Sequence, residues 1–298
     1  MSETIEGLTT RPLVPTDARA VYEVMAAQEK HDVGEIVIEE ADIVGDWQRP
    51  SYDVSANTLG FFDGDRLVGY GEVAGSWHGD AAVHPDYRGR GIGTAIARWM
   101  QEKARASGST IIGMSVAEGS AGDRLLEALG YFVRWTSWVL ELPAGTEIPH
   151  RRPPEGYVVR EARPDEYDAC WTVTEDAFLE WSERERDTFE DWAAQVMNRP
   201  GFEPWTLRVA ADPAGEVVGV AVLHKNDGYG YVDKLATRKD QRGKGLAQCL
   251  LIDAFEVARA HGCTRSELAT DSRTGALTLY EKVGMRPTST WLHRAINL

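Results

Sequence analysis

Apolar residues recur along the chain in two rhythms, which predict a succession of strands and helices. Spacings of three and four residues, as at Val21, Val24 and Met25, are typical of a helix that buries one face. Short apolar runs on either side of the segment 63–65, Asp-Gly-Asp, indicate a hairpin. The first half is expected to contain strand 8–13, helix 15–28, a helix around 43–47, strands 59–62, 67–73 and 80–83, helix 93–106, strand 110–116, helix 121–129 and two strands within 131–142.

The same succession returns in the second half of the chain. A loop that begins at Arg88 matches a loop that begins at Arg242, and Leu-Gly at 129–130 matches Val-Gly at 283–284, both at an offset of 154 residues. Upstream of these loops the best offset is 149 residues, so the insertions between the copies lie in the earlier loops. A register kept over this length indicates that a fold unit has been duplicated.

The segment 142–157 is expected to separate the two copies, because its prolines and glycines interrupt every periodic pattern. We place the boundary near Pro149, with one domain at 1–148 and a second at 149–298. A chain of 298 residues is long enough for two domains with separate cores. In each copy the order of elements predicts an α/β fold whose mixed sheet carries helices on both faces.

The charge balance limits the possible partners. Acidic residues outnumber basic ones by 47 to 32, which gives a net charge of −15. This charge opposes binding to nucleic acids and to anionic membranes. The start of the chain, at residues 1–4, has no basic segment followed by an apolar stretch, as a leader peptide would. No apolar run approaches the ~20 residues that span a bilayer. We therefore expect a soluble cytoplasmic protein, and a monomer in which the two copies form an internal pseudo-dimer.

The cysteines give no sign of a disulfide framework or a metal site. Cys170, Cys249 and Cys263 lie far apart in the second copy, without a histidine at metal-ligand spacing. Because no nearby histidine would lower their pKa, Cys170 and Cys249 are expected to be ordinary buried thiols on helix faces. No metal is expected.

Each copy carries a glycine-rich loop between a strand and a helix. The first glycine loop consists of Arg88, Gly89, Arg90, Gly91, Ile92 and Gly93, and the second glycine loop consists of Arg242, Gly243, Lys244, Gly245, Leu246 and Ala247. Such glycines let several backbone N–H groups point inward beside the start of a helix, which suits a pyrophosphate group. The sequence G-x-x-x-x-G-K-[ST] of nucleotide triphosphatases does not occur, and a hairpin before each loop argues against a dinucleotide-binding fold.

A second motif follows each loop. Residues 279–285 read Leu-Tyr-Glu-Lys-Val-Gly-Met, and residues 125–131 are a less complete version in the first copy. Together with the glycine loops, this motif resembles the GNAT superfamily of acyl-CoA-dependent N-acyltransferases over both halves of the chain. The resemblance implies two tandem GNAT folds and acetyl-CoA as the cofactor, with its pyrophosphate on the loop amides. The pantetheine arm would pair with the strand before each loop, at Leu235, Ala236 and Thr237 or at Ala81, Ala82 and Val83.

The resemblance also implies that the two copies are unequal. In this superfamily the tyrosine of the second motif commonly lies near the thioester sulfur, where its hydroxyl group can protonate the departing thiolate, and Tyr280 holds that position. The matching residue of the first copy is Leu126, which has no proton to donate. We expect the second copy to be catalytic and the first to bind CoA without turnover. A degenerate structural copy, and a core role for Tyr280, are the alternatives.

Acetyl transfer to an amine also needs a base that removes a proton before or during the attack. On the strand before the second glycine loop, the two-residue repeat places Tyr231, Asp233 and Leu235 on one face. Asp233 is the carboxylate closest to the expected acyl centre, so it is the candidate base. A salt-bridged or hydrated Asp233 at a strand edge is equally consistent with the sequence, and His224 is a second candidate.

The acceptor pocket is expected beside the first two helices of the second copy. Aromatic and acidic residues there suit a small cationic amine. They are Phe178, Glu180, Trp181, Glu183 and Glu185. The alternating charges of the segment 182–187, however, are more typical of a solvated loop.

Two features depart from the family pattern. Many members have Asn where this chain has Arg273 and, in the first copy, Gly119; Asp271 and Ser272 are expected to cap the following helix instead.

Among tandem members the layout is similar to mycothiol synthase, whose catalytic half is also the second, although the acidic residue expected there aligns with Tyr231. The sequence thus predicts direct acetyl transfer to a small amine. A thiol-sugar amine of the mycothiol type, and a non-catalytic CoA-binding regulatory module, are the alternatives.

Overall fold

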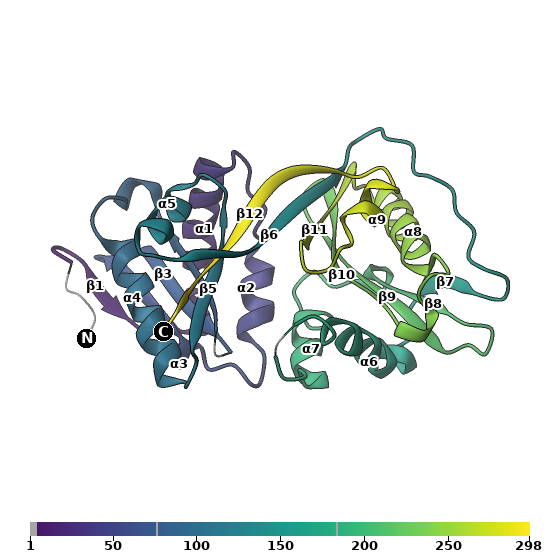
Figure 1. The fold of residues 1–298 in the computed structure, drawn as a ribbon, viewed down its shortest axis with the longest axis horizontal. Helices are drawn as coiled ribbons and strands as arrows, with labels where there is room; N and C mark the ends of the chain where they lie inside the picture. Colours follow the sequence, from purple (N-terminus) through teal and green to yellow (C-terminus); the bar gives the residue numbers. More distant parts are fainter. Residues whose placement is uncertain (1–4, 76, 183) are drawn as a thin grey trace. The chain divides into compact units, whose positions relative to one another are not determined.

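The chain forms two compact units in the computed structural model, which describes residues 5–75, 77–182 and 184–298. Unit 1 comprises Met1–Thr136 and Thr290–Leu298, and unit 2 comprises Ser137–Ser289. Each unit is a mixed α/β fold, as the hydrophobic pattern predicts (Figure 1). Among the described residues, every helix is too short or too polar to cross a lipid bilayer.

Unit 1 is built around a sheet with the strand order β1-β2-β3-β4-β5-β12. The expected hairpin is present, with Gly64 in its turn at a φ of 58°. The short helix α3 was not expected from the sequence. The elements are β1 (Thr9–Arg11), α1 (Ala18–Asp32), α2 (Glu40–Trp47), α3 (Val54–Asn57), β2 (Thr58–Asp63), β3 (Arg66–Ala74), β4 (His78–Val83), α4 (Ile92–Ala106), β5 (Ile111–Ala117) and α5 (Ala121–Ala128).

Unit 2 repeats this plan with the strand order β6-β11-β10-β9-β8-β7. Its elements are β6 (Phe132–Leu142), β7 (Val158–Glu161), α6 (Tyr167–Phe178), α7 (Phe189–Gln195), β8 (Leu207–Ala211), β9 (Val217–Lys225), β10 (Tyr229–Thr237), α8 (Leu246–Ala260), β11 (Arg265–Asp271) and α9 (Leu277–Glu281). The last strand, β12 (Arg286–Asn297), begins in unit 2 and joins the sheet of unit 1. The pairs of strands expected at the end of each copy are single long strands, β6 and β12.

The last strand of each sequence repeat completes the sheet of the other unit. Strand β6 belongs to the first repeat, but its residues 137–142 pair antiparallel with β11 in unit 2. Strand β12 belongs to the second repeat, but its residues 291–297 pair antiparallel with β5 in unit 1. The compact units therefore differ from the sequence repeats 1–148 and 149–298, because the two repeats exchange their final strands.

Helices cover both faces of each sheet. Successive side chains of a strand point to opposite faces, so neighbouring residues pack in different hydrophobic clusters. In unit 1, Phe61 packs in the cluster that includes α4, whereas its neighbour Phe62 packs in the cluster that includes α1 and α2. Helix α8 covers one face in unit 2, and α6 with α7 covers the other. Strand β9 is apolar on both faces for this reason, as expected for a strand between two layers of helices. Each side chain buried in this way contributes about 1.5–3 kcal/mol.

The cysteines are free and buried, as predicted. Burial raises the pKa of the Cys170 thiol to about 12, and burial also raises the pKa of Cys249 and of Cys263. Thiols in this state are poor nucleophiles at neutral pH, so they act as packing residues.

Candidate active site

The second glycine loop connects β10 to α8 in a conformation that requires its glycines. Gly243 and Gly245 both have a φ of 80°, a left-handed conformation that side chains with a Cβ rarely adopt. Gly245 is also the N-cap residue of α8. The first N–H groups of a helix have no partner within the helix, and the positive end of the helix dipole lies beside them. The loop can therefore accept an anion.

The second glycine loop borders a large cavity in unit 2. Its volume is about 730 Å³, which lies within the range of ~300–1,000 Å³ typical of small-molecule sites. Its walls come from the end of α6, the second half of β10, the loop, the start of α8, the end of β11 and α9. Of the residues predicted to bind the cofactor, those that line this cavity are Leu235, Ala236, Thr237, Arg242, Gly243, Gly245, Leu246 and Ala247. Lys244 lies outside the lining.

A separation of two parallel strands opens this cavity. Strands β10 and β11 pair only from Tyr229 to Tyr231, opposite Arg265 to Glu267. Residues 232–237 of β10 continue to pair with β9 on their other side. The side of β10 that faces away from β9 therefore becomes a wall of the cavity just before the second glycine loop. Backbone amides at such an open edge can pair with an extended ligand.

Tyr280 lies in the cavity wall, on α9, as the second motif predicts. Its side chain is buried, with 9% of its surface exposed. Burial raises the pKa of the Tyr280 phenol, a hydrogen bond with Thr270 lowers it, and the nearby carboxylate of Asp271 raises it; the net direction is upward. The phenol therefore keeps its proton throughout the neutral range and can act as a donor.

Asp233 also lines the cavity, but its surroundings differ from those expected of a base. The pairing of β10 with β9 has a bulge between Val232 and Lys234, so the regular alternation expected across Asp233 is interrupted. The carboxylate of Asp233 accepts a hydrogen bond from Nζ of Lys234 at 2.8 Å. Burial alone would raise the pKa of Asp233, but the charges of Lys234, His224 and Arg199 lower it to about 2. A carboxylate of this kind is a weak base.

The other carboxylates in the cavity wall are also paired with cations. Glu180 accepts two hydrogen bonds from the guanidinium group of Arg242, at 2.7 and 2.9 Å. Asp271 accepts hydrogen bonds from the backbone N–H and the side chain of Arg273, so it does not cap α9 as the sequence suggested. Residue Ala276 is the N-cap of that helix. Among the described residues of the wall, each carboxylate thus has its charge compensated.

Arg273 contacts both Trp181 and Asp271, two residues of the cavity wall. Its guanidinium carbon lies 4.8 Å from the centre of the Trp181 ring, while its nitrogens bind Asp271. Phe178 and Trp181 line the cavity as expected, and Glu185 is not among the described lining residues. Glu183 lies outside the described residues. The part of the cavity at Phe178 and Trp181 therefore offers aromatic faces rather than uncompensated negative charge.

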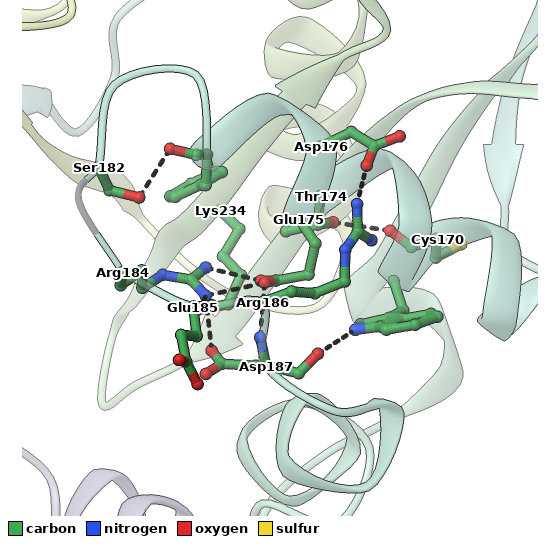
Figure 2. A network of polar contacts seen from close by, with 12 residues as sticks. Cys170, Thr174, Glu175, Asp176, Ser182, Arg184, Glu185, Arg186, Asp187 and Lys234 are labelled. Carbon is green, nitrogen blue, oxygen red and sulfur yellow. Dashed lines mark hydrogen bonds and ion pairs between the residues drawn. The ribbon is translucent and has the colours of Figure 1, made fainter. Parts of the chain in front are cut away.

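Ion pairs and hydrogen bonds hold the segment that follows α6, whereas its alternating charges predicted a solvated loop. Figure 2 shows Arg184 and Glu175 facing each other across this segment. Both terminal nitrogens of Arg184 bind the buried carboxylate of Glu175, at 2.8 and 2.7 Å, and the backbone N–H of Asp187 binds it at 3.0 Å. Arg186 pairs with Asp176. These contacts fix the loop that carries Trp181 beside the cavity.

Comparison with known proteins agrees with this geometry. The model of the acetyltransferase (GNAT) family matches residues 22–131 and 164–285, one match in each half of the chain. The chain belongs to the GNAT acetyltransferase family. It is an acyl-CoA N-acetyltransferase with two GNAT segments in tandem, which decides against a non-catalytic binding module.

Similar proteins include mycothiol acetyltransferases. That of Salinispora arenicola is 32% identical over 213 residues, covering 69% of this chain and 68% of that protein. That of Streptomyces coelicolor is 27% identical over 286 residues, covering 93% and 90%. Among solved structures, a GCN5-related N-acetyltransferase from Sphaerobacter thermophilus has a TM-score of 0.75 at 25% identity, covering 98% and 96% of the two chains. A tandem GNAT protein from the clavulanic acid biosynthesis pathway shares the fold, with a TM-score of 0.72 at 19% identity, covering 97% and 98%.

In the N-terminal unit of this acetyltransferase, the first glycine loop keeps its backbone shape. Gly89 and Gly91 have φ values of 77° and 89°, and Gly91 is the N-cap of α4. Arg88 forms two hydrogen bonds of 2.7 Å with Asp32, much as Arg242 pairs with Glu180. The two copies of the loop are thus structurally alike, although Gly93 is the part of the first loop that borders the neighbouring cavity in unit 1.

The groove beside the first glycine loop is filled by side chains. The cavity there has a volume of about 120 Å³. Oε1 of Gln28 accepts a hydrogen bond of 3.0 Å from the backbone N–H of Val83, one of the groups predicted to pair with pantetheine. A Cβ on Gly93 would lie 2.7 Å from Cδ2 of Leu125, so that side chain closes the space beside α4. The prediction that Ala82, Val83 and residues 88–93 bind CoA stays a prediction, and this geometry speaks against it.

Sequence reasoning missed two features of the sites. An offset of 149 residues relates Gln28 to Ala177, which lines the open cavity and whose side chain cannot accept a hydrogen bond. Comparing the two repeats residue by residue along their first helix could have revealed this difference. The second feature is Arg151, which sequence patterns assign to a solvated linker but which lines the cavity of unit 2.

Proposed function

We propose that unit 2 binds acetyl-CoA and transfers its acetyl group directly to the amine of a small molecule. One observation carries this proposal. The second glycine loop, the open edge of β10 and the phenol of Tyr280 border a single cavity of about 730 Å³. Family membership establishes N-acetyl transfer, while the assignment to unit 2 and to these residues rests on that arrangement.

The residues of the cavity suit the three parts of acetyl-CoA. Backbone N–H groups of the second glycine loop and of the first turn of α8 suit the pyrophosphate. The open edge of β10 at Leu235, Ala236 and Thr237 suits the amides of the pantetheine arm. Tyr280 then lies on the side of the cavity where the thioester would end. Lys244, outside the lining, can reach a phosphate from the loop surface.

The chemistry requires one bond to form and one to break. The lone pair of the neutral amine attacks the thioester carbonyl carbon, a C–N bond forms, and the C–S bond breaks. Oη of Tyr280 gives its proton to the departing sulfur. A buried phenol is suited to this step because its raised pKa keeps it protonated until negative charge develops on the sulfur.

The proton of the attacking amine must leave by another route. We propose that a water molecule beside Asp233 accepts this proton, while the carboxylate of Asp233 orients the amine and stabilises the positive charge that develops on its nitrogen. The low pKa of Asp233, set by Lys234, favours a role as a fixed negative charge over direct removal of the proton. The acceptor must then reach the site with its amine already neutral, so the pKa of the amine itself governs the acidic side of the pH profile.

The carboxylates of the cavity wall already form ion pairs with Lys and Arg side chains. They therefore favour an acceptor that is neutral and polar apart from its reacting amine. A strongly cationic amine would gain little from Glu180, Asp233 and Asp271, because each already binds a Lys or Arg side chain. Aromatic faces at Phe178 and Trp181 remain for contact. The relatives named as mycothiol acetyltransferases support a thiol-sugar amine of the mycothiol type as the second candidate acceptor.

A panel of acceptors tests the proposal. The protein is incubated with acetyl-CoA and with aliphatic diamines, amino sugars and a mycothiol-type thiol-sugar amine, and each product is identified by its mass. Mass detection is preferred because a thiol acceptor would react with reagents for free CoA. We expect N-acetylation, fastest for an acceptor with a neutral polar body. If none of the acceptors is acetylated while acetyl-CoA binds, the acceptor assignment fails; if acetyl-CoA does not bind, the site assignment fails.

A further inference from the structure

Arg151 lies over the second glycine loop, although it belongs to the segment between the two repeats. A Cβ placed on Gly245 would lie 2.7 Å from Cζ and 2.8 Å from Nε of Arg151, so the guanidinium group rests on this glycine. Arg151 also interacts with the Cys249 thiol in the first turn of α8: burial raises the pKa of that thiol, and the charge and hydrogen bond of Arg151 oppose the rise. Two independent contacts thus place the guanidinium group at the start of α8.

This is an unfavourable place for an isolated cation. The start of a helix carries a partial positive charge, which repels a guanidinium group. Arg242 is compensated by Glu180, but Lys244 binds the neutral oxygens of Tyr157 and Gln241. Among the described residues, no carboxylate forms an ion pair with Arg151. Positive charge is therefore concentrated around the loop amides in a chain whose net charge is −15.

The surrounding segment holds Arg151 within reach of the loop. On one side, the backbone O of Thr146 accepts a hydrogen bond of 2.9 Å from Arg259 near the end of α8. On the other side, Oη of Tyr157 contacts both Lys244 and Gln241, at 2.7 Å each. The segment is thus attached to unit 2 at both ends, and Arg151 lies between the attachments. An ordinary solvated linker would have no such contacts.

We propose that Arg151 is a ligand of the acyl-CoA pyrophosphate and binds it beside the amides of the second glycine loop. The inference rests on the proposed function of unit 2. A planar guanidinium group can bind two phosphate oxygens at once, and such charge-assisted contacts are among the stronger hydrogen bonds in proteins. The first glycine loop has no such cover, because nothing among the described residues lies within 4 Å of a Cβ placed on Gly89 or Gly91.

This role predicts an effect on binding rather than on chemistry. Pyrophosphate is held in the same way before and during acetyl transfer, so its ligands contribute to ground state and transition state alike. Removing Arg151 should therefore raise the KM and Kd for acetyl-CoA while kcat at saturation stays nearly constant. Replacement by Lys should restore part of the affinity, since the charge returns without the planar fork.

Calorimetry with three ligands tests the proposal. Acetyl-CoA, 3′-dephospho-acetyl-CoA and S-acetylpantetheine are titrated into the wild-type protein, Arg151→Ala and Arg151→Lys. Arg152→Ala is the matched control, because this neighbouring arginine is exposed like Arg151 but does not line the cavity. We expect Arg151→Ala to weaken binding of the first two ligands about 10-fold and to leave acetylpantetheine binding unchanged. Arg152→Ala should match the wild type with all three.

The outcomes separate this inference from the function on which it rests. If the wild type does not bind acetyl-CoA, both proposals fall. If the wild type binds and Arg151→Ala binds equally well, the role of Arg151 is wrong and the function of unit 2 stands. If the loss appears with acetyl-CoA but disappears with the dephospho ligand, Arg151 binds the 3′-phosphate and the pyrophosphate assignment is wrong. Thermal unfolding of each variant checks that the fold is intact.

Discussion

The two glycine loops of this acetyltransferase have almost the same backbone and very different surroundings. Both loops place glycines at left-handed φ values and begin a helix of 15 residues, and both hold their first arginine in an ion pair. The second loop opens into a cavity of about 730 Å³, whereas the cavity in unit 1 has about 120 Å³ and does not reach the body of the loop. The two loops therefore differ in their access to the neighbouring strand edge rather than in their backbone geometry.

The carboxylates of the two units also differ in the groups that bind them. In unit 2 each described carboxylate of the cavity wall is paired with a Lys or Arg side chain. In unit 1, Glu72 on β3 and Asp80 on β4 lie opposite each other in the sheet, and they accept hydrogen bonds from the neutral side chains of Trp47 and Tyr70. The carboxylates of the open cavity thus form ion pairs, whereas these two buried carboxyls of unit 1 are held by neutral hydrogen-bond donors.

The largest expected effect tests the catalytic difference between the copies. Tyr280→Phe removes the proposed donor and keeps the ring that packs in the core. We expect kcat to fall at least ~100-fold, as is typical for loss of a general acid, while acetyl-CoA affinity changes little. Steady-state kinetics and calorimetry on the same preparation measure both quantities. Turnover equal to that of the wild type would remove Tyr280 from the mechanism.

Leu126→Tyr is the matched variant in the N-terminal unit, because Leu126 occupies the position equivalent to Tyr280. It should not rescue the Tyr280→Phe protein, since Gln28 and Leu125 still fill the groove of unit 1. Recovery of activity in the double variant would show that the hydroxyl group alone separates the two copies.

The sequence predicted the main features of the fold because they depend on local rules. Hydrophobic periodicity located the helices α1, α4 and α8, and glycine positions located both loops and their helix starts. The exchange of β6 and β12 was not predictable from periodicity, because a strand has the same pattern whichever sheet it joins. This pairing depends on long-range contacts that leave no periodic signal.

The candidate site was predictable only where a residue forms part of a motif. Tyr280 and the second glycine loop, except Lys244, lie in the wall of one cavity, and their roles stay predictions. Asp233 was assigned from strand alternation, and a bulge at that residue changed its environment. Arg151 carries no motif, and only the path of the linker brings it to the loop. Side chains that close or cover a groove are therefore the part that needs a structure.

A second prediction concerns the buried carboxyls of unit 1. Burial, followed by the charge of Asp80, raises the pKa of Glu72 from 4.5 to about 8, despite a hydrogen bond from Trp47. A raised carboxyl pKa means that the folded state prefers the protonated form, so stability is lost as the pH rises from about 5 through 8. Glu72→Gln removes this penalty and should stabilise the protein by on the order of 2 kcal/mol at pH 9.

Chemical unfolding at several pH values measures this effect. At pH 4 the wild type and Glu72→Gln should have nearly equal stability, because Glu72 is then protonated in both folded and unfolded states. Glu23→Gln on the exposed face of α1 is the control, and it should change little at either pH. A wild-type advantage at pH 9 would contradict the raised pKa and the contrast between the two interiors.

The smallest expected effect tests the groove itself. Ala177→Gln places in unit 2 the residue type that caps the strand edge in unit 1. The new side chain should compete with pantetheine for the backbone N–H of Thr237 and weaken acetyl-CoA binding about 10-fold, or about 1.4 kcal/mol. Calorimetry should give one site per chain in the wild type, and Gln28→Ala should leave the affinity of that site unchanged. Full affinity in Ala177→Gln, or two equal sites in the wild type, would show that access to the strand edge is not what distinguishes the two loops.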